Sequence, residues 1–414
     1  MSHLTVPTPW ARAQWAAPYV LVAVLALLGA VRWTQAIDHV ADTWHGHAQD
    51  RREDVVAYYA AGKLVADGLA GKLYQPEAVA AVEQEVLGRP AGRYGGLVFL
   101  NPPFVAGLFQ PLTRLPYNEA QAVWFALNAI ALFAAILALL PELRRLPRMW
   151  AAVFVLAALA SFPVFWSFLY GQSSSFILLS WALFYRLTKD RRDLPAGLAL
   201  AATLIKPHLA IAPVACLLAT SRWRVLLAFG AAAALLVLAS VALVGPRATF
   251  LDYPTFLLGS LRWQREYGVD RAHMYGWASF FPSVLHVSRG AALALAGVAS
   301  AATLLAAVWV SRLYRHDGAR PLLALAIASI LISPHMHAQD LQLLLLPVLV
   351  ASRRDLMTVG VPVLLFLLAP VNVLTVAVAT PLLAAALALV VATPVRIAEA
   401  LAPLAPVVPS RALT

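Results

Sequence analysis

The chain has 414 residues, of which 61% are hydrophobic and only 12% are charged. Soluble globular proteins have about 45–50% apolar and about 25% charged residues, so this composition excludes a soluble domain. The formal net charge is +11. Because Lys and Arg form short clusters between apolar runs, we attribute this charge to membrane topology and expect no nucleic-acid partner.

The apolar runs approach the length of about 17–25 residues that crosses about 30 Å of hydrocarbon. The first covers about Trp15 to Trp33, lacks a clear small-residue cleavage site and predicts an uncleaved membrane helix. Backbone polar groups must be paired inside a bilayer, which favours helices, and strand-like alternation is missing. We predict an all-α polytopic membrane protein with about 10–12 transmembrane or half-spanning helices.

Residues 37–95 form a polar segment that follows the first run and is predicted to be the first extracytoplasmic loop. Within it, Val55–Leu69 and Pro76–Leu87 are amphipathic and should lie along a membrane surface. Residues 245–289 form a second large, aromatic-rich outer loop. Neither loop is expected to be a separate domain, so residues 1–414 are predicted to form one membrane domain.

Further apolar runs predict helices along the rest of the chain. They lie at about Phe104–Leu112, Tyr117–Leu140, Trp150–Leu169, Phe176–Leu187, Ala196–Ile205, Leu209–Ala219, Val225–Val244, Ala291–Leu313, Pro321–Ile332, Leu341–Val350, Leu356–Leu374 and Val376–Val391. Basic clusters between them mark the cytoplasmic side. These clusters are Arg144/Arg145/Arg148, Arg186–Arg192, Arg222/Arg224, Arg312–Arg320, Arg353/Arg354 and Arg396.

Two segments must not cross the membrane if every basic cluster is cytoplasmic. Phe104–Leu112 is then a short re-entrant piece, and Ala196–Ile205 with Leu209–Ala219 forms a hairpin of half-helices broken at Pro207. In the alternative, both segments span and the middle of the topology is inverted. We favour the first arrangement, in which the polar loops and two polar turns share the outer face.

The candidate functional residues lie in these outer segments. Asp54 begins the helical pattern that carries Tyr58 and Tyr59. Its carboxylate can cap a helix, or it can meet a lipid-linked substrate at the membrane boundary. Asn101 precedes two prolines that fix an extended path, and helix punctuation leaves the asparagine unexplained. Gln172, in a polar turn, can bind a sugar hydroxyl or satisfy a helix end.

Lys206 and His208 flank Pro207 inside an apolar stretch. A cation at membrane depth costs about 2.5–3.5 kcal/mol on insertion scales, so it needs a partner. The partner is either a protein carboxylate or the phosphate of an anionic lipid. We favour the phosphate.

The segment Ser333–Asp340 holds His335, His337 and Asp340. A divalent metal site is chemically allowed. Histidines two residues apart do not share a helical face, however, so we expect no metal cofactor and favour hydrogen bonding to phosphate or sugar. A structural polar turn is the other alternative. Arg265 and the aromatic residues of the second loop suit phosphate contact and sugar stacking, or an interfacial belt.

Taken in order, these motifs resemble the polyprenyl-phosphate-dependent glycosyltransferases of the GT-C class, and most closely glycosyltransferase family 87. The resemblance covers about residues 54–345. It is carried by Asp54, Tyr58-Tyr59, Gly68, Tyr74, Asn101-Pro102-Pro103-Phe104, Gly171-Gln172, Lys206-Pro207 and Ser333-Pro334-His335. It implies a GT-C fold in the inner (plasma) membrane, with the active site on the extracytoplasmic side.

The resemblance also implies an activity. It points to a hexosyltransferase that moves mannose or arabinofuranose from a polyprenyl-phosphate sugar to a lipid or glycan hydroxyl, with inversion. Asp54 corresponds to the catalytic base and His335 to an essential histidine. The late motif departs from the commoner Ser-Pro-x-Ser-Trp-Asp-His-His form, which leaves His337 as an alternative.

The resemblance places Lys206 near the donor phosphate. We assign donor-phosphate or sugar binding to Lys206, His208, Gln172, Asn101, His337, Tyr58, Tyr59 and Arg265. A transporter or flippase of lipid-linked or small solutes is the rival interpretation, because it too would have a buried cation and broken helices.

Overall fold

The computed structural model describes residues 9–44, 54–88, 96–263, 267, 271–285, 287–313, 318–352, 355–369 and 375–392. In these segments every regular element is helical and there is no strand. The prediction of an all-α polytopic membrane protein is confirmed.

Five segments of the described chain are long and apolar enough to cross a bilayer. They are Tyr19–Asp42 within α1 (Pro9–Trp44), α5 (Tyr117–Ala138), α7 (Arg148–Leu159) with α8 (Phe162–Tyr170), the run Trp223–Ser260, and α15 (Arg289–Leu313). Seven shorter apolar helices of 10–17 residues accompany them. This inventory agrees with the predicted mixture of spanning and half-spanning helices.

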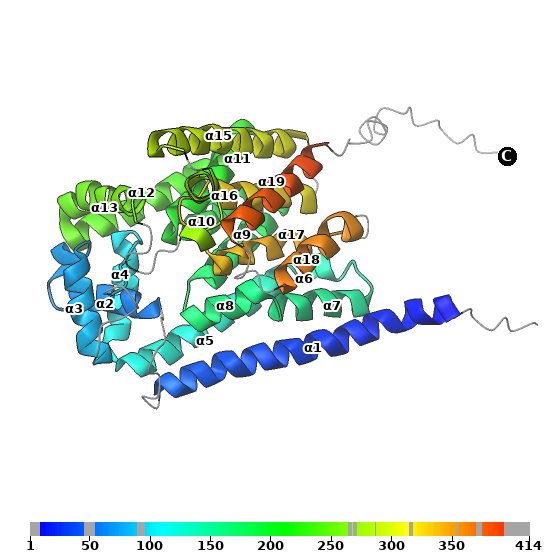
Figure 1. The fold of residues 1–414 in the computed structure, drawn as a ribbon, viewed down its shortest axis with the longest axis horizontal. Coiled ribbons are helices and arrows are strands. Elements are labelled where there is room, and N and C mark those ends of the chain that lie inside the picture. Colours follow the sequence, from blue (N-terminus) through cyan, green and yellow to red (C-terminus); the bar gives the residue numbers. More distant parts are fainter. Residues whose placement is uncertain are drawn as a thin grey trace, which may run out of the picture.

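The least buried of the long helices lie at the periphery of the molecule. α1 runs along one edge and α15 along the opposite edge (Figure 1). α1 extends well past the predicted end at Trp33. The run Trp223–Ser260 contains α12 (Trp223–Arg247), the π-helical turn η5 (Ala248–Asp252) and α13 (Tyr253–Ser260).

The segment 245–289, predicted to be the second outer loop, is therefore more helical than expected. Besides η5 and α13, residues 245–289 include the 3-10 turn η7 (Arg271–His273) and α14 (Trp277–Val284). Composition did not reveal these helices because each is eight residues long or shorter. The remaining elements are α6 (Leu140–Leu143), η9 (Leu356–Gly360), α18 (Val361–Leu368) and α19 (Val376–Ala392).

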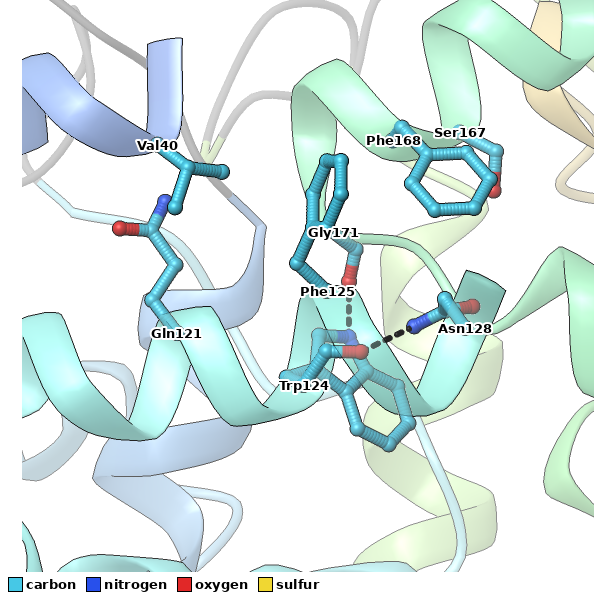
Figure 2. A pocket seen from close by; sticks show the side chains of 8 residues that line it. All are labelled: Val40, Gln121, Trp124, Phe125, Asn128, Ser167, Phe168 and Gly171. Atoms are coloured by element: carbon cyan, nitrogen blue, oxygen red, sulfur yellow. Dashed lines mark hydrogen bonds between the residues drawn. The ribbon is translucent and has the colours of Figure 1, made fainter. Parts of the chain in front are cut away.

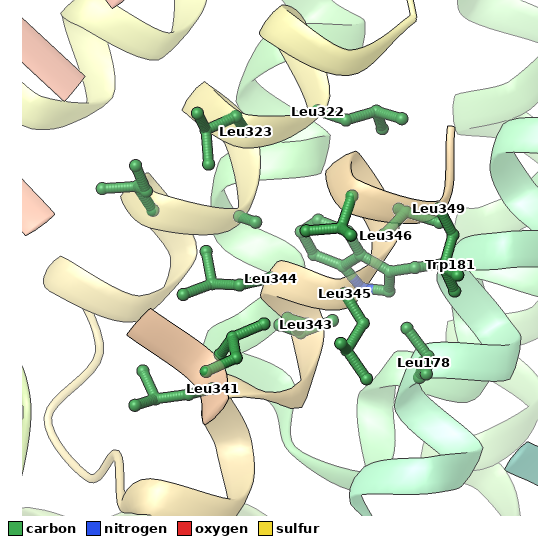
Figure 3. Close-up of a cluster of buried hydrophobic side chains, with 14 of the residues drawn as sticks. Leu178, Trp181, Leu322, Leu323, Leu341, Leu343, Leu344, Leu345, Leu346 and Leu349 are labelled. Atoms are coloured by element: carbon green, nitrogen blue, oxygen red, sulfur yellow. The ribbon is translucent and has the colours of Figure 1, made fainter. Parts of the chain in front are cut away.

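The largest apolar cluster lies inside this periphery. Its centre is formed by η8 (Ala338–Leu344) and α17 (Leu345–Leu349), whose leucines are all buried. They pack around Trp181 of α9 (Ser174–Lys189) and against α16 (Ala319–Leu331) (Figure 3). A segment that is apolar on every side is suited to such a position, because it has no polar face to turn outward.

Short helices gather at one end of the molecule. α2 (Val55–Ala66), α3 (Pro76–Leu87) and α4 (Pro103–Phe109) lie there beside α13 (Figure 1), with the 3-10 turns η1 (Ala70–Lys72) and η2 (Gln110–Arg114). Gly62 allows close packing, because a Cβ there would lie 2.8 Å from the carbonyl carbon of Phe109. α3 has the predicted bounds and α2 nearly so.

The two segments predicted not to span are short or folded back on themselves in the structure. α4 has seven residues and η2 five, and at about 1.5–2 Å per residue this piece is too short to cross a bilayer. The second segment comprises α10 (Asp193–Ala201), η3 (Ala202–Ile205), η4 (Pro207–Ala210) and α11 (Ile211–Ala219). Its two ends are joined by an ion pair of 2.8 Å between Arg222 Nη2 and Asp193 Oδ1. The segment therefore turns back on itself, with its break at Lys206.

Candidate functional site

The tip of this hairpin lies against the segment that precedes α4. Asn101 Nδ2 donates a hydrogen bond of 2.9 Å to the carbonyl oxygen of Ile205. The hydroxyl of Tyr74 donates one of 2.9 Å to the carbonyl oxygen of Asn101. Asn101 thus fastens one broken segment to another, and the residue that punctuation left unexplained has a structural partner.

Asp54 lies at the start of α2, beside the turn after α8. Its side chain makes no capping hydrogen bond and instead accepts one from Gln172 Nε2. Gly171 makes this approach possible: its φ is +65°, and a Cβ there would lie 2.7 Å from the Cβ of Val55. Trp124 Nε1 donates to the carbonyl oxygen of Gly171 at 2.7 Å and holds the turn in place.

A chain of hydrogen bonds leads inward from Asp54. Lys206 Nζ donates to Gln172 Oε1 at 3.1 Å and lies 2.5 Å from Asp340 Oδ1. Asp340 Oδ1 also accepts from the hydroxyl of Ser174 at 3.1 Å. We call Asp54, Gln172, Lys206 and Asp340 the acid–amide–lysine chain. It links four segments that are far apart in sequence.

Lys206 therefore has the protein carboxylate that was one of its two predicted partners. An ammonium group has three hydrogens to donate, and Gln172 and Asp340 accept two of them. In the described part of the chain no further hydrogen-bond partner of this group is found. A phosphate oxygen at the third position would add to these contacts and need not replace them.

The environment of Asp54 changes its acidity. Burial raises the pKa of the carboxyl group to about 6, although the hydrogen bond from Gln172 and the charge of Lys206 act in the opposite direction. The negative charge of Asp340 adds a smaller upward contribution. At neutral pH the group is mostly ionised, and its pKa is near the value that favours general-base catalysis.

His335 lies in a different set of contacts. Its Nε2 atom is 2.7 Å from the hydroxyl oxygen of Ser260, and its Nδ1 atom is buried without a hydrogen-bond partner among the described residues. Burial, with smaller contributions from the nearby His208, His337 and Arg271, lowers the pKa of His335 to about 3. The ring is therefore neutral at pH 7 and holds one nitrogen available to a ligand.

Residues of the segment 245–289 pack against this histidine and the motif around it. Arg271 Nε donates to the carbonyl oxygen of Trp263 at 2.6 Å, and its Nη2 atom donates to the carbonyl oxygen of Leu261. The backbone N–H of Tyr275 donates to the carbonyl oxygen of Met336 at 2.7 Å. These contacts hold α13 and the following loop against the late motif.

Three other predicted residues lie near these contacts. His208 Nε2 is buried without a partner in the described structure, close enough to His335 to influence it. The backbone N–H of His337 donates to Asp340 Oδ2 at 3.3 Å. Tyr58 stacks on Phe109 with a centroid separation of 5.0 Å in the apolar layer behind Asp54.

Tyr59 points away from the acid–amide–lysine chain. The hydroxyl of Tyr59 donates to the carbonyl oxygen of Leu115 at 2.8 Å, which gives Tyr59 a structural role. Arg265 lies outside the described residues. Within the described ranges no group of three or more His, Cys, Asp or Glu side chains gathers in a metal-binding arrangement.

A small cavity lies behind the turn that carries Gln172 (Figure 2). α5 contributes Gln121, Trp124, Phe125 and Asn128; Val40, Ser167, Phe168 and Gly171 complete the lining. Asn128 Oδ1 and Ser167 Oγ are buried there without hydrogen-bond partners in the described structure. Polar atoms of this kind are usually satisfied by an internal water.

Sequence reasoning missed three polar residues of this region: Asp340 as the partner of Lys206, Ser174, and Ser260. Asp340 belongs to the histidine motif, for which the sequence predicts phosphate or sugar contact and not a partner for Lys206. A search for the counter-charge of Lys206 would have found it, because few acidic residues lie close to the apolar runs. Ser174 and Ser260 gave no signal, since serines at helix ends are common.

One comparison with known proteins gives a match. A family model described as glycosyltransferase family 87 matches residues 99–334, more than half of the chain. The matched range includes Asn101, Gln172 and Lys206, while Asp54 precedes it and His335 follows it. No curated protein and no solved structure matches the chain.

Proposed function

Because the chain belongs to glycosyltransferase family 87 and is therefore a membrane-embedded glycosyltransferase, we propose that its donor is a polyprenyl-phosphate sugar. The sugar is mannose, with arabinofuranose as the second candidate. The acceptor is a hydroxyl group of an extracytoplasmic lipid or glycan. Membership of the family favours this function over a transporter.

The acid–amide–lysine chain is the observation that carries the proposal. Gln172 spans the gap between Asp54 and Lys206, so a carboxylate and a cation lie on either side of one amide group. An in-line displacement needs a base near the entering oxygen and positive charge near the leaving oxygen. The spacing of the two side chains suits both requirements.

Asp54 is the proposed general base. The acceptor hydroxyl attacks the anomeric carbon while its proton passes to the Asp54 carboxylate. The bond between the anomeric carbon and the phosphate oxygen breaks, and its electron pair remains on the polyprenyl phosphate. Because the attack comes from the face opposite the leaving group, the product has the inverted anomeric configuration.

The leaving phosphate is proposed to lie on the Lys206 side. The third hydrogen of the Lys206 ammonium supplies one contact. His335 and His208 each hold a buried ring nitrogen without a partner in the described structure; such a nitrogen can accept a hydrogen bond from a sugar hydroxyl or, where it carries the proton, donate one to a phosphate oxygen. A lipid-linked donor fits this site because the acid–amide–lysine chain is formed by broken helices within an apolar bundle.

A donor panel tests the proposal. Purified protein is incubated with polyprenyl-phosphate mannose, polyprenyl-phosphate arabinofuranose or a nucleotide sugar, each with membrane lipid acceptors. We expect transfer from a polyprenyl-phosphate sugar with inversion at the anomeric carbon. Transfer from the nucleotide sugar alone, or retention of configuration, would refute the donor assignment and the displacement mechanism, respectively.

Two aspartates of the same region provide a test variant and its matched control. Asp54→Asn should lower the rate by about 10²–10⁴-fold, the usual contribution of general-base catalysis. Asp67→Asn, at the other end of α2, removes one partner of an exposed pair with Lys63 and should leave the rate unchanged. An active Asp54→Asn variant would remove Asp54 as the base.

Orientation is tested by labelling of single cysteines in a Cys216→Ser background. Asp67→Cys lies at the end of the molecule that holds Asp54, and Asp190→Cys lies in the basic region after α9. We expect an impermeant reagent applied to intact cells to label position 67 and leave position 190 unlabelled. The opposite result would place the site on the cytoplasmic side.

A further inference from the structure

We propose that Asp340 is a positioning residue for Asp54, and that it acts through Lys206 to fix which end of the Gln172 amide faces the carboxylate. The inference rests on the proposed function, because it explains how the base of that reaction is kept ionised. Asp340 lies on η8, in the centre of the molecule, and reaches Asp54 through Lys206 and Gln172.

The Gln172 side chain has two chemically different ends. Its oxygen accepts hydrogen bonds and its NH₂ group donates them. The Lys206 ammonium can only donate, so it requires the amide oxygen, which lies 3.1 Å from Nζ. The NH₂ group must then face Asp54, where it donates to the carboxylate. Lys206 therefore decides the orientation of the amide.

Asp340 in turn decides the position of Lys206. The Lys206 Nζ to Asp340 Oδ1 distance is 2.5 Å, and the side chains are 12% and 3% exposed, respectively. Asp340 is itself held by the Ser174 hydroxyl at 3.1 Å and by the backbone N–H of His337 at 3.3 Å. Because both oxygens of the Asp340 carboxylate are held by hydrogen bonds, the ion pair fixes the position of the Lys206 ammonium group.

Release of Lys206 would change the hydrogen bonding of Asp54. If Nζ no longer contacted Gln172 Oε1, the amide could rotate by half a turn and present its oxygen to Asp54. An oxygen facing a carboxylate is repulsive, whereas an oxygen facing a protonated carboxyl group accepts a hydrogen bond. The rotated amide would therefore favour the neutral acid, which cannot accept a proton.

The described groups that influence Asp54 electrostatically come from several elements. Lys206 and Asp340 change the pKa of Asp54 through their charges, and Gln172 changes it through its hydrogen bond. Tyr58 of α2 and Glu83 of α3 are the other titratable neighbours. Glu83 is fully buried, and burial raises the pKa of its carboxyl group to about 7. A titration of Asp54 must therefore be separated from that of Glu83.

Infrared difference spectroscopy can provide this titration without turnover. The carboxylic-acid C=O band that is absent in Asp54→Asn reports the neutral form of Asp54, and its intensity is followed against pH in the full-length protein. A Glu83→Gln background removes the second carboxyl group that titrates in the same range. The midpoint of the remaining band then belongs to Asp54.

The expected shift in Asp340→Asn has a sign that separates two explanations. Loss of a nearby negative charge alone would lower the Asp54 midpoint. Loss of positioning frees Lys206 and the amide, and should raise the midpoint by about one pH unit. Asp340→Glu, which keeps the charge and can still pair with Lys206, should restore much of the wild-type midpoint.

Two further variants keep the test open if Asp340→Asn does not fold. Ser174→Ala removes a hydrogen bond to Asp340 without a change of charge, so positioning predicts a smaller rise and electrostatics alone predicts none. In a Gln172→Leu background the amide is gone, and Asp340→Asn or Ser174→Ala should then no longer raise the midpoint. This double-mutant comparison isolates the route through Gln172.

A lowered or unchanged Asp54 midpoint in both Asp340→Asn and Ser174→Ala would overturn the inference. So would a rise that persists without Gln172. These outcomes are independent of the donor panel: a protein that transfers no sugar refutes the proposed function, yet its Asp54 still titrates. If the protein transfers sugar but the Asp54 midpoint is not raised in Asp340→Asn and Ser174→Ala, only the role of Asp340 is refuted.

Discussion

The lipid-facing helices and the broken segments at the centre differ in how they are held. In α15 and in the run that contains α12, only 22% and 17% of the most apolar window is buried, whereas every residue of η8 and α17 is buried. The buried residues of these two helices are small: Ala292, Ala296, Thr303, Ala307 and Val310 in α15, and Val225, Ala228 and Ser240 in α12. The broken segments meet through Asn101, Gln172, Lys206 and Asp340, whose partners lie on other segments.

This difference has a physical cause. Lipid tails are as apolar as leucine, so no hydrophobic force draws the outer helices inward, and their surfaces can vary. A broken helix exposes backbone groups and polar side chains that the bilayer cannot satisfy. Such segments are tolerated where they satisfy one another, and the place where they do so in this protein is the candidate site.

The largest stability effect is expected from a break in the central ion pair. Asp340→Ala leaves Lys206 buried without its carboxylate and should destabilise the protein by about 3–5 kcal/mol, measured as a loss of thermal stability in detergent. The comparison is Asp67→Asn, which breaks the exposed pair with Lys63 and should cost less than about 1 kcal/mol. Equal effects would contradict the contrast between the two regions.

A core leucine should follow in size. Leu345 of α17 is fully buried, and Leu345→Ala should cost about 2 kcal/mol or more because the centre cannot collapse around the cavity. Leu238 of α12 is 62% exposed, and Leu238→Ala should change stability by less than about 0.5 kcal/mol. A large effect at Leu238 would indicate that this face contacts a protein partner and not lipid.

Two glycines with positive φ allow the effect of backbone strain to be separated from the effect of displacing the turn that carries Gln172. Gly171→Ala forces an alanine into a left-handed conformation, at about 1–2 kcal/mol, and brings its Cβ within 2.7 Å of Val55 Cβ. Gly68→Ala, with φ +74° and no atom within 4 Å of the added Cβ, has the strain alone. Sugar transfer should fall about tenfold or more only in Gly171→Ala, since a 1 Å misplacement has effects of this order.

The pH dependence should be the mildest effect. Asp54 must be ionised to act as a base, so the transfer rate should be level above its pKa of about 6 and fall about tenfold per pH unit below it. The contribution of Asp54 to the free energy of unfolding should instead become more favourable as the pH falls through 6. Because the folded-state pKa lies above the unfolded value, Asp54→Asn should be more stable than wild type above pH 6, and this advantage should shrink as pH falls through 6. A constant difference would contradict the assignment.

Sequence predicted the helices well and the contacts poorly. The bounds of α3, α5 and α15 follow from runs of apolar residues and from the prolines and charges that end them. The hairpin around Lys206 followed from the need to place basic clusters on one side. These features depend on the bilayer, whose thickness and apolarity act on every residue in the same manner.

The site depended on information that a single sequence does not contain. Asp54 and Lys206 were selected by position and residue type, and the structure brings both into one hydrogen-bonded chain. The pairing of Lys206 with Asp340 joins residues 134 positions apart, and the role of Ser260 depends on how the second outer loop folds over His335. Short helices such as α13 were missed because aromatic residues at a membrane boundary occur in loops and helices alike.

The most direct test of the central claim is an experimental structure of the full chain with a polyprenyl-phosphonate sugar, a donor analogue that cannot be cleaved. We predict that the phosphonate contacts Lys206 and that the anomeric carbon faces Asp54, with Gln172 between the two charged groups. A donor bound elsewhere in the molecule, with neither Asp54 nor Lys206 within contact distance, would contradict this account.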